Sequence, residues 1–275
     1  VRPRTGSVTG RAQGQRWIVN QKPDKIAVTG TRGIPGLQGG VETHCEELFP
    51  RIAAKGYDIT VVRRKNYVMD RLTSYKGVTL HDIPNVRKKS FEAILHTLRS
   101  IWWAKWGCHA RIVHIHAVGP ALLTPFARVL GMKVIFTHHG PDYNREKWGK
   151  AAKFMLELGA RMGCLFANEI IAISHVISDL IKQKYERSNA HLIHNGVPPP
   201  IRINDTGYLK ELEVETGKYI FAMGRFVPEK NFHCLIKAFS SLKQSGYQLV
   251  IAGDADIEDE YSKQLKRLAK ENDVI

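Results

Sequence analysis

The sequence of 275 residues is poor in cysteine and contains no long apolar run. Its four cysteines lack the paired spacing that indicates a zinc site: Cys45, Cys108, Cys164 and Cys234. We therefore expect reduced, mostly buried thiols in a cytoplasmic protein. No apolar run approaches the roughly 20 residues that cross a bilayer. Any membrane contact is expected to be peripheral, on the inner face of the membrane.

Acidic side chains are also scarce. Lys and Arg total 41 against 26 Asp and Glu, which gives a formal net charge of +15. Such an excess favours anionic partners, namely nucleotides, phosphorylated lipids, an acidic membrane face or nucleic acid. Residues 1–24 show no sustained periodicity, so we predict a mobile leader or a cloning or gene-calling remnant. Trp17 alone provides no stacking platform in this segment, and no nucleic-acid partner is expected.

A glycine-dense turn is the most informative local pattern. Ile26–Val28 predicts a buried strand, and apolar residues at helical spacing predict a helix from Val41 to Ala53. Between them lie five glycines that allow close approach to main-chain N–H groups: Gly30, Gly33, Gly36, Gly39 and Gly40. The start of the helix offers unpaired N–H groups to an anion. The turn thus predicts a phosphate site within a nucleotide or a phosphorylated sugar, although a tight turn without a ligand also fits.

Strands and helices alternate beyond this turn. The predicted strands are Ile59–Arg63, Val78–Ile83, Ile112–His116, Val134–Thr137, Ile170–Ser174 and Leu192–His194. The predicted helices lie near Ser90–Gly107, Pro120–Leu130, Lys147–Ala167 and Val176–Tyr185. This order predicts an α/β fold with a doubly wound parallel sheet. Ligands of such sheets bind beyond the carboxyl ends of the strands, which places Gly30–Gly40, His116–Gly119 and His138–Asp142 on one edge.

The helix near Ser90–Gly107 is basic and amphipathic. With Trp102, Trp103 and Trp106 it has the composition of a helix that lies in a membrane interface. A helix that covers the sheet has nearly the same pattern, and we favour that packing role.

A second domain is expected after a hinge at residues 198–217. Residues 25–197 form the first domain, and residues 218–275 begin a second domain with two β-α units. Two units do not close a parallel-sheet domain, so we expect the second domain to be truncated. Its first strand-to-helix turn contains Gly224, which leaves room for a ligand, and two cations suited to a diphosphate, Arg225 and Lys230.

Four stretches together resemble the family 4 glycosyltransferases with the two-domain GT-B fold. They are GTRGIPGLQGGVET (Gly30–Thr43), THHGPDYNREKWG (Thr137–Gly149), HNGV (His194–Val197) and GRFVPEKN (Gly224–Asn231). The first two look most like the branch that has a rhamnosyltransferase-like N-terminal domain. The resemblance covers about Lys25–Ile275, and it implies that residues 25–197 are the acceptor-side domain and that residues 218–275 begin the nucleotide-sugar-binding domain. It implies a retaining transferase that moves sugar from a nucleotide-diphosphate sugar to a glycan or lipid-linked acceptor, in bacterial surface polysaccharide biosynthesis.

The resemblance also implies site residues. Arg225 and Lys230 would contact the donor diphosphate, and Gly39 and Gly40 would approach the sugar or phosphate. His139 would face the donor sugar near the reacting carbon. The resemblance implies neither a cofactor nor a metal, because fixed cations replace one. The paired glutamates that the family carries later in the second domain have no counterpart in this sequence, which puts sugar transfer by this chain in doubt.

An extended short-chain dehydrogenase or epimerase is the main alternative. Its dinucleotide turn matches Gly30, Gly33 and Gly36 after Thr29, and its catalytic pair matches Tyr143 and Lys147. Arg63 and Arg64 would then take a 2′-phosphate. Against this stand Pro35, which crowds the turn, and the unexplained second domain. A third interpretation is a non-catalytic relative that only binds a phosphate-bearing ligand.

Most histidines are expected to be structural or at the surface, His44 among them. His138 lies one residue from His139, so the two can be confused. His114 and His116 alternate along one predicted strand, and we expect them on opposite sides of it, so that at most one lines the ligand-binding edge.

Overall fold

The structure is a computed structural model that describes residues 24–84, 92–144, 148–202, 205–241, 246–255 and 258–275. Contacts divide the chain into two compact units, Val1–Val197 and Pro198–Ile275. The leader predicted at residues 1–24 lies almost wholly outside the described residues.

The first unit is built on an eight-stranded sheet of order β3-β4-β2-β1-β5-β6-β7-β8. Its strands are β1 (Ile26–Thr29), β2 (Ile59–Arg64), β3 (Ser74–Tyr75), β4 (Val78–Ile83), β5 (Ile112–His116), β6 (Lys133–His138), β7 (Glu169–Ala172) and β8 (Ala190–Leu192). Every neighbouring pair is parallel except β3 and β4. The doubly wound parallel sheet is confirmed. The short antiparallel β3 was not predicted, and β8 begins two residues before the strand expected there.

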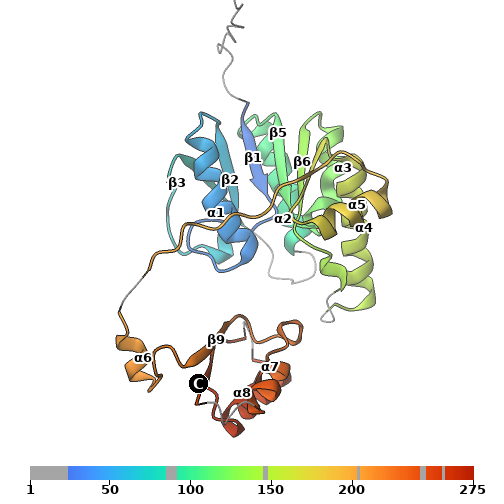
Figure 1. Cartoon of the computed structure of the whole chain (residues 1–275). Helices are drawn as coiled ribbons and strands as arrows, with labels where there is room; N and C mark the ends of the chain where they lie inside the picture. Colours follow the sequence, from blue (N-terminus) through green and yellow to red (C-terminus); the bar gives the residue numbers. More distant parts are fainter. Residues whose placement is uncertain (1–23, 85–91, 145–147, 203–204, 242–245, 256–257) are drawn as a thin grey trace, which may run out of the picture. The chain divides into compact units, whose positions relative to one another are not determined.

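Helices connect these strands as the alternation predicts (Figure 1). They are α1 (Gly40–Ala53), α2 (Glu92–Trp106), α3 (Thr124–Val129), α4 (Lys150–Phe166) and α5 (His175–Tyr185), with short 3-10 turns η1 (Lys65–Tyr67), η2 (Pro120–Leu123) and η3 (Asp142–Asn144). The helix predicted at Pro120–Leu130 is divided into η2 and α3. Within the described residues, no helix is both long and apolar enough to cross a bilayer.

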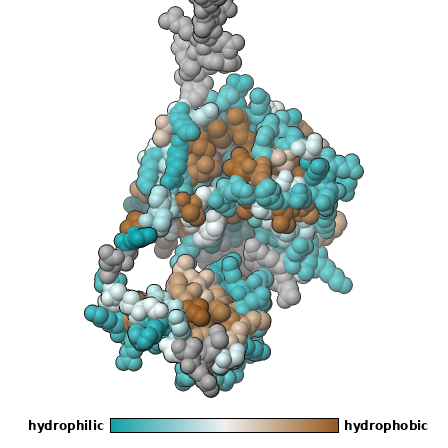
Figure 2. Space-filling view, viewed as in Figure 1, coloured by the Kyte–Doolittle hydropathy of each residue, from teal (hydrophilic) through white to brown (hydrophobic). Residues whose placement is uncertain are grey.

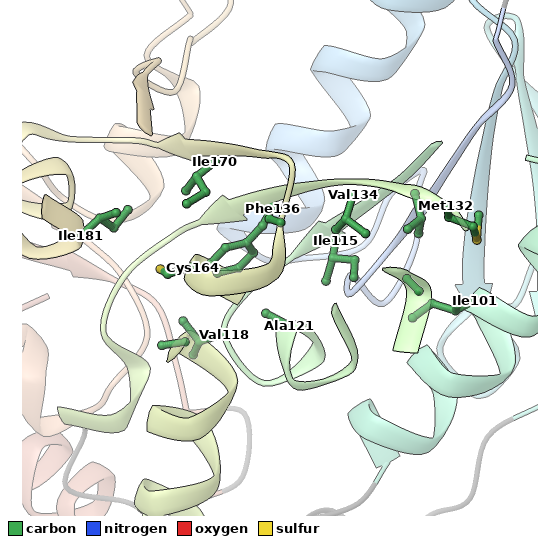
Figure 3. Packing of buried hydrophobic residues seen from close by; sticks show 14 of the residues in the cluster. Ile101, Ile115, Val118, Ala121, Met132, Val134, Phe136, Cys164, Ile170 and Ile181 are labelled. Atoms are coloured by element: carbon green, nitrogen blue, oxygen red, sulfur yellow. The ribbon is translucent and has the colours of Figure 1, made fainter. Parts of the chain in front are cut away.

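Two apolar clusters cover the two faces of the sheet. Alternate residues of a strand face opposite sides, and accordingly Val28 packs with Phe49 of α1 while Ala27 belongs to the cluster on the other face. That second cluster includes Phe136 of β6 and Cys164 of α4 (Figure 3). Helix α4 comes close to the sheet because Gly163 has no side chain. A Cβ at Gly163 would lie 2.7 Å from the Phe136 ring.

Successive strands are added to opposite sides of the sheet before and after the boundary between β1 and β5, although these two strands are parallel. From β1 the chain continues to β2 on one side, whereas β5 starts the succession towards β8 on the other. The loops after β1 and β5 therefore lead to opposite sides of the sheet. In doubly wound sheets, this is the place where ligands bind. Gly30, with φ of +95°, allows the two loops to touch, since a Cβ there would lie 2.1 Å from the His116 carbonyl oxygen.

The second unit is a smaller α/β arrangement. Its elements are α6 (Gly207–Glu211), β9 (Tyr219–Met223), η4 (Pro228–Lys230), α7 (Phe232–Ser240), β10 (Gln248–Ala252) and α8 (Glu260–Glu271). Strands β9 and β10 pair in parallel, and α7 packs with α8 and β10 through Phe239, Leu249 and Leu265. Phe221 and Met223 of β9 are 55% and 75% exposed, and Figure 2 shows apolar surface on this unit.

Candidate functional site

Four histidines and a threonine gather where β5 and β6 end, on the face covered by α1. The Nδ1 atom of His116 lies 2.9 Å from Nε2 of His139, within hydrogen-bond distance. The His44 ring of α1 lies 5.5 Å from the His139 ring and 5.9 Å from the His116 ring, between centroids. His114 stacks on His116 at 4.2 Å, and its Nε2 is 2.7 Å from Thr137 Oγ1. We call His44, His114, His116 and His139 the histidine cluster.

The cluster corrects one sequence-based expectation and adds one residue to the candidate site. His114 and His116 were expected on opposite sides of their strand, which is wrong because residues two apart share a face. Both rings contact Phe49 of α1, at 5.7 Å each between centroids. His44 was expected to be structural or at the surface, yet it lies beside His139. Its position in the first turns of a helix that follows the glycine turn was the signal that could have revealed it.

The structure separates His139 from its neighbour His138. Consecutive residues of β6 point to opposite faces, so His138 contacts Phe136, at 5.7 Å between ring centroids, on the side away from α1. The amide N–H of Gly140 donates to His138 Nδ1 at 3.2 Å. His139, the residue singled out by its position before Gly140, is the one that joins the histidine cluster.

Burial keeps the cluster uncharged. Loss of water lowers the pKa of His139 to about 4 and that of His114 to about 3, with nearby histidines adding to the effect. The pKa of His116 lies well below its ordinary value for the same reasons, burial first. At neutral pH these side chains are therefore neutral imidazoles, and each has one donor and one acceptor nitrogen. No group of three or more His, Cys, Asp or Glu among the described residues is arranged to hold a metal ion.

The hydrogen bond between His116 and His139 favours one tautomer. Within the described chain, Nε2 of His116 is buried without a hydrogen-bond partner. An unpaired buried N–H is rarer in proteins than an unpaired acceptor, so His116 should carry its proton on Nδ1 and donate it to His139 Nε2. Nδ1 of the half-buried His139 is then an N–H donor.

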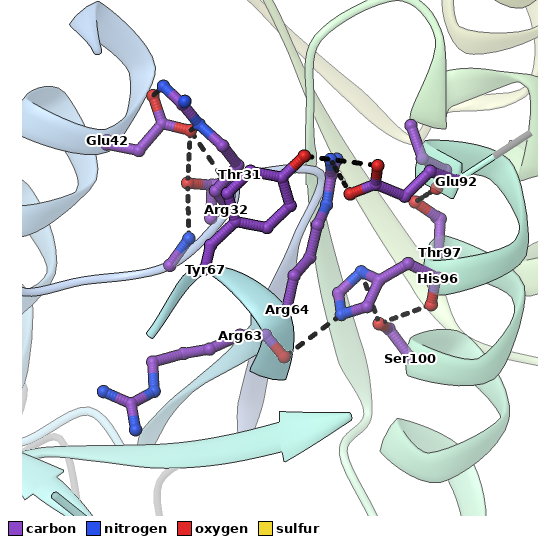
Figure 4. Close-up of polar contacts among 12 residues, drawn as sticks. Thr31, Arg32, Glu42, Arg63, Arg64, Tyr67, Glu92, His96, Thr97 and Ser100 are labelled. Carbon is purple, nitrogen blue, oxygen red and sulfur yellow. Dashed lines mark hydrogen bonds and ion pairs between the residues drawn. The ribbon is translucent and has the colours of Figure 1, made fainter. Parts of the chain in front are cut away.

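The glycine turn is organised by a buried carboxylate, Glu42 (Figure 4). Its Oε1 accepts hydrogen bonds from the Arg32 amide at 3.1 Å, from Arg32 Nε at 3.2 Å and from Thr31 Oγ1 at 3.3 Å. Burial alone would raise the pKa of Glu42, but the hydrogen bonds and charge of Arg32 lower it overall. Glu42 is thus ionised at neutral pH, and its charge in the first turn of α1 is matched by Arg32.

The two glycines that end this turn have different roles. Gly39 has φ of +150°, and a Cβ there would lie 2.1 Å from Glu42 Oε2 and 2.6 Å from Arg32 Nη2. Gly39 is therefore required for the ion pair itself. Gly40 is exposed, and nothing lies within 4 Å of the Cβ that it lacks. Of the two, Gly40 at the start of α1 is the position that leaves space for a ligand.

The two arginines that end β2, Arg63 and Arg64, form ion pairs within the protein. Arg63 is fully buried and bonds to Asp82 at 2.6 Å and to Asp70 at 2.9 Å. Arg64 pairs with Glu92 of α2 at 3.4 Å, and Tyr67 donates to the same carboxylate at 3.2 Å (Figure 4). The assignment of Arg63 to a 2′-phosphate is wrong, because its guanidinium has no exposed surface. This removes a main support for a dehydrogenase.

The structure gives no support to the catalytic pair of the dehydrogenase pattern, Tyr143 and Lys147. Tyr143 is buried, with 9% of its surface exposed. Its proposed partner Lys147 lies outside the described residues.

The turn after β9 presents two exposed cations, Arg225 and Lys230. A Cβ at Gly224 would lie 3.7 Å from Lys230 Cδ, so the lysine stem runs over this glycine. The turn is anchored by the Gly224 amide, which donates to Ala252 O at 3.0 Å. Asn231, with φ of 54°, follows Lys230 and is the N-cap residue of α7. The turn is therefore held in shape by its backbone and places positive charge at a helix N-terminus.

Comparisons with known families agree with this division of the chain. The family model described as Glycosyltransferase Family 4 matches residues 38–199, and the one described as Glycosyl transferases group 1 matches residues 208–275. The first match includes α1 and the histidine cluster, and the second includes the turn with Arg225. Comparison with curated proteins gave no match.

Several solved structures share the fold. Sucrose-phosphate synthase from Thermosynechococcus elongatus is 18% identical, with a TM-score of 0.70 over 91% of this chain and 68% of its own. HepE from Anabaena in complex with UDP-glucose is 16% identical, with a TM-score of 0.67 over 91% and 66%. Starch Synthase IV from Arabidopsis thaliana bound to ADP and acarbose is 12% identical, with a TM-score of 0.67 over 91% and 72%. The chain thus has the GT-B fold of these enzymes and spans about two thirds of their length.

Proposed function

Because the chain belongs to Glycosyltransferase Family 4, we propose that it transfers a sugar, with retention of anomeric configuration, from a nucleotide-diphosphate sugar to an acceptor. Support for such a donor comes from HepE, whose structures contain UDP, UDP and glucose, or UDP-glucose. The acceptor that we propose is a glycan or a lipid-linked glycan in bacterial surface polysaccharide biosynthesis, on the cytoplasmic side. The branch with a rhamnosyltransferase-like N-terminal domain stays a prediction.

The observation that carries the proposal is the cationic turn of the second unit. Arg225 can donate two parallel hydrogen bonds to a diphosphate, and Lys230 adds a compact charge beside the start of α7. Together they would stabilise the negative charge that develops on the leaving diphosphate. We propose that these fixed charges serve in place of a metal ion. Because Gly224 has no side chain, the Lys230 stem can pass close to the backbone of this turn, which would keep the ammonium group near the bound diphosphate.

We assign sugar binding in the first unit to His139. Its neutral ring is fixed by His116, and the Nδ1–H that this arrangement favours suits a hydroxyl oxygen of the sugar. A protonated imidazole would place a positive charge beside any oxocarbenium-like carbon, so a lowered pKa helps the reaction. Gly40 would leave room for the sugar or phosphate at the start of α1.

Titration calorimetry with UDP, GDP, dTDP and their sugars tests the proposal. Arg225→Ala should weaken binding of the preferred nucleotide sugar by about 2 kcal/mol, the value of a hydrogen bond to a charged group. Lys263→Ala removes an exposed cation of α8 in the same unit and should leave affinity unchanged. Equal affinity in the wild type and the Arg225 variant would remove the assignment. Binding of NADP in preference to all nucleotide sugars would support the dehydrogenase instead.

A further assay separates catalysis from binding alone. A chain that binds a nucleotide sugar but never releases its sugar, to water or to any added acceptor, would be the non-catalytic relative. Chromatographic detection of the free nucleoside diphosphate is sufficient for this purpose, since every transfer releases one.

A further inference from the structure

Helix α2 has a buried face and an apolar exposed face. Ile101 and Ala104 are fully buried against the sheet, which agrees with the packing role favoured by the sequence. On the outer side Leu98, Trp102 and Trp106 follow at four-residue intervals and are 36%, 57% and 46% exposed. The two indole rings lie 4.1 Å apart between centroids. The helix thus carries an apolar stripe that the described chain leaves exposed.

A basic pocket adjoins the end of this stripe. Its volume is about 340 Å³, and its charged or titratable lining residues are Lys105, His109, Arg111, Lys133 and Asp24. At this pocket Lys105 of α2 lies beside the loop before β6. A Cβ added to Gly131 of that loop would lie 3.9 Å from Lys105 Nζ.

The pocket keeps an excess of positive charge. Arg111 is paired with Asp24 at 2.8 Å, whereas no carboxylate partner of Lys105 or Lys133 is found among the described residues.

The sequence around the stripe is free of acidic residues. Between Ala93 and Lys133 there is no Asp or Glu, and five cations occur there: Arg99, Lys105, Arg111, Arg128 and Lys133. In the sequence, Arg87, Lys88 and Lys89 come shortly before α2. Exposed indoles next to unmatched cations are the composition of surfaces that lie in a headgroup layer, where tryptophan is enriched and anionic lipids attract lysine and arginine.

We propose that the outer face of α2 and the basic pocket bind an anionic phospholipid bilayer. The indoles of Trp102 and Trp106 enter the headgroup layer, and a lipid phosphate occupies the pocket beside Lys105 and Lys133. Charge complementarity favours an anionic lipid over a purely apolar protein partner. The inference is independent of the donor chemistry, because binding to vesicles requires neither a nucleotide sugar nor turnover.

Co-sedimentation of the full chain with vesicles tests the proposal. Binding is expected to vesicles that contain phosphatidylglycerol in equal parts with phosphatidylcholine, to be weak for phosphatidylcholine alone, and to fall with added salt. The double variant Lys105→Ser/Lys133→Ser should bind the anionic vesicles about 30-fold less tightly, at about fivefold for each cation. Trp102→Ser/Trp106→Ser should weaken binding while retaining the preference for anionic lipid.

Matched controls come from other helices of the same unit. Lys182→Ser in α5 removes an exposed cation, and Phe154→Ser in α4 removes an aromatic ring that is 68% exposed. Both should bind like the wild type, and near-ultraviolet circular dichroism checks that each variant is folded. The basic leader is common to all variants, so it does not affect the differences between them.

Three outcomes would overturn the inference. The first is equal binding to vesicles with and without phosphatidylglycerol. The second is a loss of binding in the controls as large as in the Lys105 and Trp102 double variants. The third is a change of oligomeric state in the Trp102→Ser/Trp106→Ser variant, measured by sedimentation velocity, which would make the stripe a contact between protein chains.

Discussion

Acidification from pH 7 to pH 5 should destabilise the first unit through its buried histidines. The pKa is lowered from 6.5 to about 4 for His96, His138 and His139, and to about 3 for His114, with burial as the main cause in each. In the unfolded chain these imidazoles regain their ordinary pKa. The unfolded state therefore binds more protons between pH 4 and pH 6.5, and stability, fully present above that range, is lost as the pH falls through it.

The magnitude follows from these pKa values. At pH 5 a histidine whose pKa drops from 6.5 to about 4 on folding costs about 2 kcal/mol relative to pH 7. Four such residues give about 8 kcal/mol, which is comparable with the whole free energy of unfolding of a domain. The lowered pKa of Glu42 or Asp70 does not add to this loss, because unfolded carboxyl groups titrate below pH 5.

Urea unfolding followed by tryptophan fluorescence measures the effect. All five tryptophans precede Pro198 in the sequence, so their emission reports the first unit. His114→Gln should reduce the difference in free energy of unfolding between pH 7 and pH 5 by about 2 kcal/mol. Val113→Ala, at a fully buried position that does not titrate, should lower stability equally at both pH values. A difference below about 2 kcal/mol in the wild type, the contribution of one histidine, would refute the reasoning.

Gly39→Ala should lower the free energy of unfolding by about 2 kcal/mol, since it strains the backbone and displaces Arg32 from Glu42; Gly40→Ala should change it by less than about 0.5 kcal/mol in the same urea titration. In a transfer assay Gly40→Ala should nevertheless slow the reaction, and a wild-type rate would argue against a ligand at this position. His139→Ala should lower kcat in the complete protein more than it weakens donor binding, and equal losses would indicate a purely positional role. Sugar transfer should persist in EDTA, whereas a loss reversed by Mg²⁺ would contradict the assignment of the cations.

Local patterns were sufficient for much of the fold. The strand Ile26–Thr29, the turn and the helix that starts at Gly40 depend on glycine and on helical spacing, which act within a few residues. The same holds for β9, its turn and α7 in the second unit. The prolines that follow Val197 interrupt the alternation of strands and helices, and the expected hinge at residues 198–217 rests on that interruption.

The polar clusters were not predictable, because they depend on strand register. His116 pairs in the sheet with Thr137, so His139 comes beside it only when β5 and β6 align in that way. Arg63 pairs with Asp82 across β2 and β4 for the same reason. A pattern within one strand contains no information about these partners, and the role of Arg63 was misassigned as a result.

The last two residues of β6 and the residue after it show how narrowly the site is specified. His138 and His139 have the same chemistry, and only their parity along the strand decides which imidazole meets His116. One residue inserted into or deleted from the strand would exchange them and leave the composition of this segment almost unchanged. The number of residues within β6 is therefore itself part of the site, as much as the identity of His139.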